Sequence, residues 1–230
     1  MDTITMIKQW FTDVLQMDYV KQGAFALMGF LVLAGGIYYY RISLIHKEQA
    51  AHQAFEQCYD EFQKAVEKKS DEFSFEVVKV CELGYEQNKN THMGPYFLAV
   101  QADALAREGK MEQAIEKMED VITHMPSDSQ LYWLYKTKLG LFKLDSEDDT
   151  VNQDGLKELE VAVQARGNDN KDIGLYYLGL YAWTKNQVEQ AKQWWEQLER
   201  IESKAQEQLS PWASMAQEKL RAIDTKKNVA

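Results

Sequence analysis

Residues 95–127 read PYFLAVQADALAREGKMEQAIEKMEDVITHMPS and decide the fold, because their apolar residues follow two successive helical stripes. The first stripe consists of Leu98, Ala102 and Leu105. The second consists of Met111, Ala114, Met118 and Val121. Gly109 stands between the stripes, where a turn needs a left-handed backbone, and Pro126 ends the second stripe. The stretch therefore predicts two antiparallel helices joined by a tight turn.

A second hairpin of the same design begins at Asp172. Its apolar positions are Leu175, Leu178, Gly179 and Ala182 on the first helix, and Val188, Ala191, Trp195 and Leu198 on the second. Asn186 occupies the turn, because asparagine tolerates the left-handed conformation. Helical hairpins that recur in this way, with small residues at the crossings, are typical of tetratricopeptide repeats of about 34 residues.

The spacing of the two hairpins leaves room for one more between them. Ala114 and Ala191, the small residues at the two helix crossings, are 77 positions apart, whereas two ideal periods span about 68. We therefore expect a degenerate middle unit with an insertion of about nine residues, placed at the acidic stretch 145–149. Its helices are marked by Leu131, Tyr135, Leu139 and Phe142, and by Leu156, Leu159, Val161 and Val163.

The flanking sequence is helical as well. Residues 46–69 predict one long helix and residues 73–88 a second, which together form a first hairpin. Pro211 can open a last helix, whose apolar face is formed by Trp212, Met215, Leu220 and Ile223. This helix would cap the open edge of the terminal repeat. The predicted fold class is all-α: a tetratricopeptide-like α-solenoid of antiparallel helix pairs with a C-terminal capping helix.

Residues 23–40, GAFALMGFLVLAGGIYYY, contain no charge. As a helix they would span roughly 27 Å at 1.5 Å per residue, close to a hydrocarbon core of about 30 Å. Tyr38, Tyr39 and Tyr40, followed by Arg41, resemble an interface anchor. A buried core helix and a cleaved signal peptide are the alternatives. The 22 residues that precede the stretch and the apolar sequence that continues to Ile45 favour an uncleaved transmembrane helix.

These patterns divide the chain into five parts: an N-terminal amphipathic segment (1–22), the transmembrane helix (23–40), the exit helix with the first hairpin (41–90), the repeats with their cap (91–225), and a tail (226–230). The N-terminal segment, with Ile7, Trp10, Phe11, Val14 and Leu15 at helical spacing, is expected to lie on the membrane surface. The charges on either side of residues 23–40 are nearly balanced, so they do not decide the orientation.

Composition and motifs argue against several classes of function. The net charge of −10 argues against nonspecific binding of nucleic acid, which needs a basic face. No nucleophile elbow or P-loop is present, and the four histidines lack the spacing of metal ligands. The acidic stretch 145–149 lacks the glycine and glutamate of a calcium loop. We expect a noncatalytic protein without a cofactor, although an enzyme with a divergent site is a distant alternative.

Cys58 and Cys81 lie about equally far from the turn of the first hairpin, so antiparallel helices would place them at the same height. They could form a disulfide if this part of the chain faces an oxidising compartment. Alternatively, they are two small buried residues that pack at the helix interface out of bonding range. The sequence leaves both possibilities open.

Aromatic residues are concentrated in the later repeats, where they could line the concave face of the solenoid. By position in the unit, Tyr176 and Trp183 are expected on this face, with Tyr96 and Arg107 in the earlier unit. Exposed aromatic side chains in a groove form a reasonable surface for peptide binding. The alternative for each of them is packing between repeats.

The arrangement as a whole resembles the YfgM-type family of Gram-negative bacteria. The resemblance is most specific at residues 86–91, EQNKNT, before the first clear repeat, and at Ser210-Pro211 before the last helix. Residues 1–22, the stretch 145–149 and the three tyrosines match this family less well. Members of the family are ancillary subunits of the SecYEG translocon.

The resemblance implies a single-pass protein of the bacterial inner membrane, with a cytoplasmic N-terminus, an uncleaved anchor and a periplasmic repeat domain. Its implied partners are the SecYEG translocon, a PpiD-type periplasmic chaperone and, through the anchor, membrane lipid. The implied function is that of a noncatalytic adaptor that assists chaperone recruitment to secreted proteins. A scaffold for another cell-envelope complex is the alternative.

Overall fold

The computed structural model describes residues 3–16, 18–68, 71–205 and 210–227. Within these ranges, the side chains of residues 3, 11, 13–26, 71–74, 202–205, 226 and 227 are not described. Over these ranges it contains ten α-helices and no strand, so the all-α prediction is confirmed. The chain divides into two compact units, Met1–Ala50 and Ala51–Ala230. The expected tail keeps helical backbone to Lys227, and its last three residues lie outside the described ranges.

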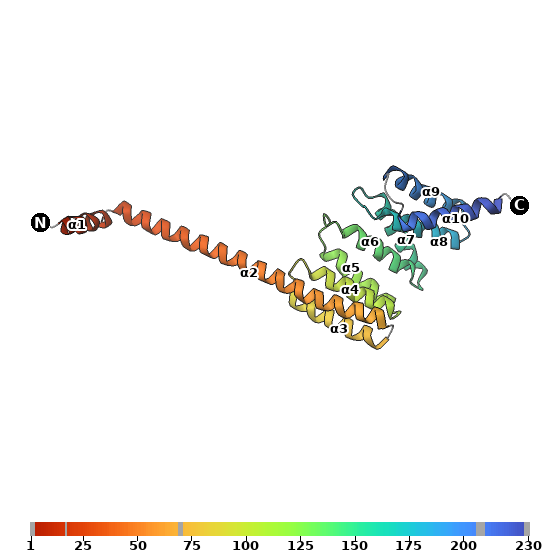
Figure 1. Ribbon diagram of the computed structural model, residues 1–230, viewed down its shortest axis with the longest axis horizontal. Coiled ribbons are helices and arrows are strands. Elements are labelled where there is room, and N and C mark those ends of the chain that lie inside the picture. The colour runs from red at the N-terminus through yellow and green to blue at the C-terminus, as the bar shows by residue number, and fades with distance from the viewer. Residues whose placement is uncertain (1–2, 17, 69–70, 206–209, 228–230) are drawn as a thin grey trace. The chain divides into compact units, whose positions relative to one another are not determined.

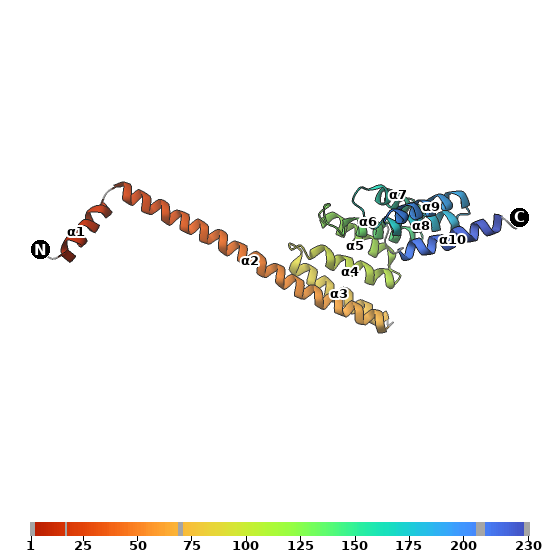
Figure 2. The same ribbon diagram turned by 45° about the horizontal axis from the view of Figure 1, so that its top comes forward.

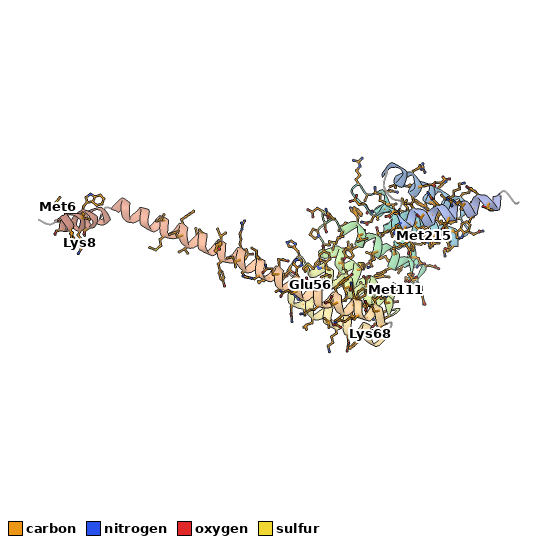
Figure 3. The ribbon with its side chains drawn as sticks, viewed as in Figure 1. Met6, Lys8, Glu56, Lys68, Met111 and Met215 are labelled. Carbon is orange, nitrogen blue, oxygen red and sulfur yellow. A yellow bond between two sulfur atoms is a disulfide. The ribbon has the colours of Figure 1, made fainter. Side chains whose placement is uncertain are left out.

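The first unit consists of α1 (Thr3–Gln16) and the N-terminal part of α2 (Asp18–Lys68). Ile4, Ile7 and Trp10 are exposed on α1, whereas the side chains of Phe11, Val14 and Leu15 lie outside the described residues. In α2, every side chain from Leu27 to Tyr40 is exposed (Figure 3). The helix has an 18-residue window with a mean hydropathy of 1.4, none of which is buried. It is therefore long and apolar enough to span a membrane.

The second unit stacks helix pairs in chain order (Figure 1). The C-terminal part of α2 and α3 (Asp71–Asn88) precede three hairpins and a last helix. These are α4 (Gly94–Arg107) with α5 (Met111–His124), α6 (Tyr132–Leu144) with α7 (Asp149–Gln164), α8 (Lys171–Thr184) with α9 (Val188–Ala205), and α10 (Pro211–Lys227). Each hairpin contacts the next, and α10 packs on both α8 and α9 (Figure 2). The second unit is thus the predicted solenoid with its cap.

The two clear hairpins match position by position at a spacing of 77 residues. Gly109 and Asn186 both have a positive φ, of 75° and 61°. In each turn a backbone N–H closes the end of the first helix: Lys110 donates to the Leu105 carbonyl and Gln187 to the Ala182 carbonyl, at 3.0 and 2.8 Å. Ala114 and Ala191 are both completely buried at the helix crossings. The expectation of a repeated unit is therefore correct in its detail.

The expected nine-residue insertion at the stretch 145–149 is wrong. The first residues of α4 and α6 are 38 positions apart, and those of α6 and α8 are 39 positions apart, so both units exceed 34 by a few residues. The stretch itself is a short connection that ends in a helix cap. Asp148 Oδ1 accepts hydrogen bonds from the backbone N–H of Thr150 (2.7 Å) and of Val151. The side chain of Thr150, together with these two backbone N–H groups, lowers the pKa of the Asp148 carboxyl. The acidic side chains therefore begin α7 instead of forming a long loop.

The buried face of the capping helix α10 differs from the predicted face at Met215. Ala213, Ala216, Leu220 and Ile223 of α10 are buried against the last hairpin. Met215 is exposed, because it falls outside the i, i+3, i+7 spacing of these four residues (Figure 3). Met215 thus lies beside the buried face of α10 and not on it.

The equivalent turns at Gly109 and Asn186 allow a controlled test of the backbone conformation at Gly109. Gly109→Ala is expected to lower the free energy of unfolding by about 1 kcal/mol, because a β-carbon is strained at a positive φ. Gly109→Asn should cost less, because the equivalent residue of the later unit is Asn186. Urea unfolding followed by circular dichroism checks both variants. Equal stability of Gly109→Ala and the parent protein would contradict the assignment of this turn.

Candidate functional site

The second unit carries a groove along the first helices of its hairpins, and the groove holds two adjoining cavities. The first, here called the apolar cavity, has a volume of about 360 Å³. The second, here called the mixed cavity, has a volume of about 660 Å³. Four residues line both cavities: Asp103, Lys138, Leu141 and Tyr177. The two cavities are therefore parts of one surface, to which α4, α6 and α8 each contribute.

Aromatic rings wall the apolar cavity on two sides. Phe55 and Tyr59 come from α2, and Trp212 comes from the capping helix α10. Tyr135 of α6 lies between them in chain order, and Tyr177 of α8 completes the aromatic set. Aliphatic side chains of α4, α6 and α8 fill the spaces: Ala99, Val100, Leu134, Leu141 and Ile173. Such a lining favours apolar side chains of a partner.

One ion pair crosses the groove. Lys138 Nζ of α6 donates to Asp103 Oδ2 of α4 at 2.6 Å, and both side chains are only partly exposed. The pair joins two neighbouring repeats at the boundary of the two cavities. In the mixed cavity, the guanidinium of Arg107 lies over the ring of Phe62, 5.4 Å from its centroid. Charged residues thus stand at the edge of the aromatic surface, and the Asp103–Lys138 pair is neutral as a whole.

Tyr135 remains protonated in the groove. Burial raises the pKa of its phenol to about 12, and the neighbouring Tyr96 and Asp103 act in the same direction. Its ring packs against the ring of Tyr96, with centroids 6.2 Å apart. Tyr135 is therefore a neutral hydrogen-bond donor at any physiological pH.

The residues predicted for the groove lie in different surroundings. Arg107 lines the mixed cavity. Tyr96 is half-buried, and its ring packs near the rings of Phe55 and Tyr135, but it lines neither cavity. Trp183 is half-buried and packs on the ring of Trp195, inside its own hairpin. Arg107 thus lines a cavity, Tyr96 contacts two aromatic residues of the apolar cavity, and Trp183 packs within a repeat.

The expectation that Tyr176 presents an exposed ring is wrong. Only 4% of this residue is exposed, because its ring packs against Trp212 of the capping helix, with centroids 5.4 Å apart. The aromatic residue of α8 that lines both cavities is Tyr177, the next along the chain. The 77-residue spacing could have identified it, since Val100 of the earlier unit also lines the apolar cavity.

Cys58 and Cys81 are joined in the structure, with Cα atoms 5.0 Å apart, and both are completely buried. Cys58 lies on α2 among Phe55, Tyr59 and Phe62, the three aromatic residues that this helix contributes to the groove. Cys81 lies on α3. The link therefore ties the α2 wall of the groove to the helix behind it.

The described residues offer no group of three or more His, Cys, Asp or Glu side chains that could hold a metal ion. The chemistry of the groove is that of a binding surface: aromatic rings, aliphatic side chains, one ion pair and one stacked guanidinium.

Comparison with solved structures supports the fold. Two similar crystal structures come from Podosopora anserina. The first is a kinesin light chain-type protein with nearly identical TPR-like repeats, and the second is its Q17M variant. The first has a TM-score of 0.54 at 17% sequence identity over 75% of this chain and 88% of its own. The variant has a TM-score of 0.52 at 16% identity over 76% and 97%. No protein-family model and no curated protein matches the sequence. The chain has a TPR-like helical repeat fold.

Proposed function

We propose that this protein is a noncatalytic, membrane-anchored adaptor that binds segments of other polypeptides in its groove. The observation that carries the proposal is the apolar cavity, to which five helices of the second unit contribute side chains. Solenoids use such concave surfaces to bind extended partners. The apolar stretch of α2 would hold the adaptor at the membrane.

The repeat domain is proposed to lie in the periplasm. A disulfide between Cys58 and Cys81 would persist in an oxidising compartment and not in the cytosol. The chain would then cross the inner membrane once, with residues 1–22 in the cytoplasm and residues 91–225 available to exported proteins. Resemblance to the YfgM-type family supports the same orientation.

The proposed site of action is the SecYEG translocon, where the adaptor would help to recruit a PpiD-type periplasmic chaperone to secreted proteins. The support for these partners is the sequence resemblance at residues 86–91 and 210–211. A tethered groove close to the translocon exit would meet emerging chains at high effective concentration.

Protease accessibility in intact spheroplasts tests the orientation. We expect an added protease to degrade the repeat domain without lysis, whereas an epitope placed before residue 1 stays protected until the membrane is opened. A cytosolic protein serves as the control for intactness. Protection of the repeat domain before lysis would contradict the periplasmic location.

Photo-crosslinking in intact cells tests the partners. A photoreactive amino acid at Tyr177, inside the groove, is expected to capture components of the translocon, the chaperone or secreted chains. The same amino acid at Val161, which is 55% exposed on α7 and lines neither cavity, is the matched control. Capture of an unrelated envelope complex at Tyr177 would replace the translocon with the alternative scaffold role. The same products from both positions would contradict binding in the groove.

A further inference from the structure

The N-terminal helix α1 carries its described apolar and polar side chains on opposite sides. At about 100° per residue, one arc of roughly 160° holds the apolar ones: Ile4, Met6, Ile7 and Trp10. The other arc holds the polar ones: Thr5, Lys8, Gln9 and Thr12. Figure 3 shows Met6 and Lys8 on opposite sides of the helix. The four apolar side chains are 59–73% exposed, so this apolar face is open to its surroundings.

A helix of this length and composition needs a surface to pack on. α1 has 14 residues, and isolated helices shorter than about 12–15 residues are marginal in water. Its β-branched and aromatic residues, such as Ile4, Ile7 and Trp10, have lower helix propensity than alanine or leucine. Most of the stability of such a helix comes from packing of its apolar face. We therefore expect α1 to be stabilised by an apolar surface.

The connection to α2 determines which surface α1 can reach. α1 ends at Gln16, and α2 begins at Asp18. The uncharged stretch of α2 begins at Gly23, which is about 7.5 Å along the helix from Asp18 at 1.5 Å per residue. The headgroup layer of a bilayer is itself roughly 5–8 Å thick on each side of the hydrocarbon core. If α2 spans a membrane, the C-terminal end of α1 is therefore held at the level of the lipid headgroups.

The charges of α1 give it no preference for anionic lipid. The helix contains one basic residue, Lys8, and one acidic residue, Asp13, so its net charge is zero. On the polar arc, the hydroxyl of Thr12 donates to the Lys8 carbonyl at 2.7 Å, and Thr5 and Gln9 are uncharged. Surface helices that recognise anionic lipid carry several Lys or Arg residues on the polar face. Attraction of α1 to a bilayer therefore has to come from burial of its apolar side chains.

We propose that α1 lies in the membrane surface beside the spanning helix, with Ile4, Ile7 and Trp10 inserted into the lipid, and that this binding is independent of lipid charge. The inference rests on the membrane anchor of the proposed function, because α2 must span the membrane for α1 to reach it. The anchor then contacts lipid in two ways, through a spanning helix and through a surface helix. The apolar face of α1 is covered by lipid and is closed to soluble partners.

Fluorescence quenching of the full-length protein in phosphatidylcholine vesicles tests the position of α1. An environment-sensitive fluorescent amino acid replaces Ile7 on the apolar arc or, as the matched control, Gln9 on the polar arc. Lipids with a nitroxide on the acyl chain should quench position 7, and iodide on both sides of the membrane should quench it about fivefold less than position 9. Equal quenching by iodide at both positions would overturn the inference. Protection of position 7 from both quenchers would also overturn it, because protein would then cover the face.

Hydrogen exchange of the α1 amides in the same vesicles measures the strength of the contact. Ile7→Glu should lower the protection of these amides roughly 10- to 100-fold, because a buried apolar side chain is lost and the released helix is marginal in water. Gln9→Glu adds the same charge on the polar arc and should change the protection less than about threefold. Equal losses in the two variants would contradict insertion of the apolar face.

Lipid charge provides a separate test. When roughly a third of the phosphatidylcholine is replaced by phosphatidylglycerol, the protection of the α1 amides should change less than about twofold, because the helix has no net charge. A rise of about tenfold that disappears in ~0.5 M NaCl would overturn the independence from lipid charge.

Position 33 distinguishes a failure of this inference from a failure of the anchor. Leu33 is exposed in the apolar stretch of α2, so the same fluorescent amino acid there should be quenched by the acyl-chain nitroxide. Quenching at position 33 without quenching at position 7 would overturn the inference and leave the anchor intact. Absence of quenching at position 33 would overturn the anchor and the inference with it. Quenching at both positions, with the loss of protection in Ile7→Glu, supports both.

Discussion

Trp195→Ala is expected to lower the free energy of unfolding of the repeat unit by about 3–5 kcal/mol, the usual cost of removing a large buried aromatic side chain. Trp195 is completely buried at the centre of the core that α6–α10 share. Its indole Nε1 also donates a hydrogen bond to the Tyr176 carbonyl at 3.1 Å. Thermal and urea unfolding measured by circular dichroism would show the loss.

Trp195 packs against a glycine of α8, and the earlier hairpin contains an equivalent pair of residues. Gly179 lies directly against the indole: a β-carbon there would stand 2.3 Å from Trp195 Nε1. In the earlier hairpin, the positions 77 residues before are Ala102 and Met118, and both are completely buried. The later unit thus fills this space with a glycine and a tryptophan, whereas the earlier unit fills the equivalent space with an alanine and a methionine.

A double-mutant cycle tests this exchange. Gly179→Ala alone should cost about 1–3 kcal/mol, because the added methyl group meets a rigid ring. When Trp195→Met is also present, the pair copies Ala102 and Met118, and the cost of the methyl group should largely disappear. A coupling of at least about 1 kcal/mol is expected. Additive effects of the two substitutions would contradict the equivalence of the hairpins.

The second large effect concerns the link between α2 and α3. Replacing both Cys58 and Cys81 with Ala is expected to destabilise the α2–α3 hairpin by about 3 kcal/mol. The link closes a loop with a sequence separation of 23, and opening it restores the entropy of that loop to the unfolded hairpin. Because repeat proteins unfold in local units, the loss should be confined to this end of the solenoid.

Hydrogen exchange resolves this local effect. Amides of α3 should exchange roughly 100-fold faster in the double variant, whereas amides of α8 should exchange as before. Treatment of the parent protein with a reducing agent should reproduce the change, and the double variant should not respond to that agent. Mass spectrometry of the non-reduced protein from membranes reports whether the bond exists in the cell. Free thiols there would contradict the disulfide and weaken the case for a periplasmic domain.

Much of the fold could be predicted from local patterns. The helical stripes of residues 95–127 are set by side chains three or four positions apart, so they are visible in the sequence itself. The turn residues Gly109 and Asn186 are visible for the same reason, because a positive φ restricts the residue type at one position. The placement of the inserted residues could not be predicted, because helices and connections each lengthen by a residue or two without a distinct signal.

The groove was harder to predict than the repeats. Arg107 lines the mixed cavity, whereas Tyr177, and not the predicted Tyr176, lines both cavities. Neighbouring positions on a helix differ by about 100° around its axis, so a small error in the assumed rotation exchanges a core residue for a groove residue. The rotation of α8 is set by Trp195 and by the covering Trp212, which come from other helices.

The sequence by itself determined the all-α class, the two matching hairpins 77 residues apart, the capping helix and an apolar stretch long enough to span a membrane, because periodicity and turn chemistry act over short distances along the chain. Only the tertiary structure decided that Asp103 pairs with Lys138, that Tyr176 is buried and that Tyr177 lines both cavities. Each of these features depends on side chains of neighbouring helices, whose rotation and stacking are fixed by packing between residues far apart in sequence. The residues 95–127 thus specify a repeat, and the stack of repeats specifies the groove.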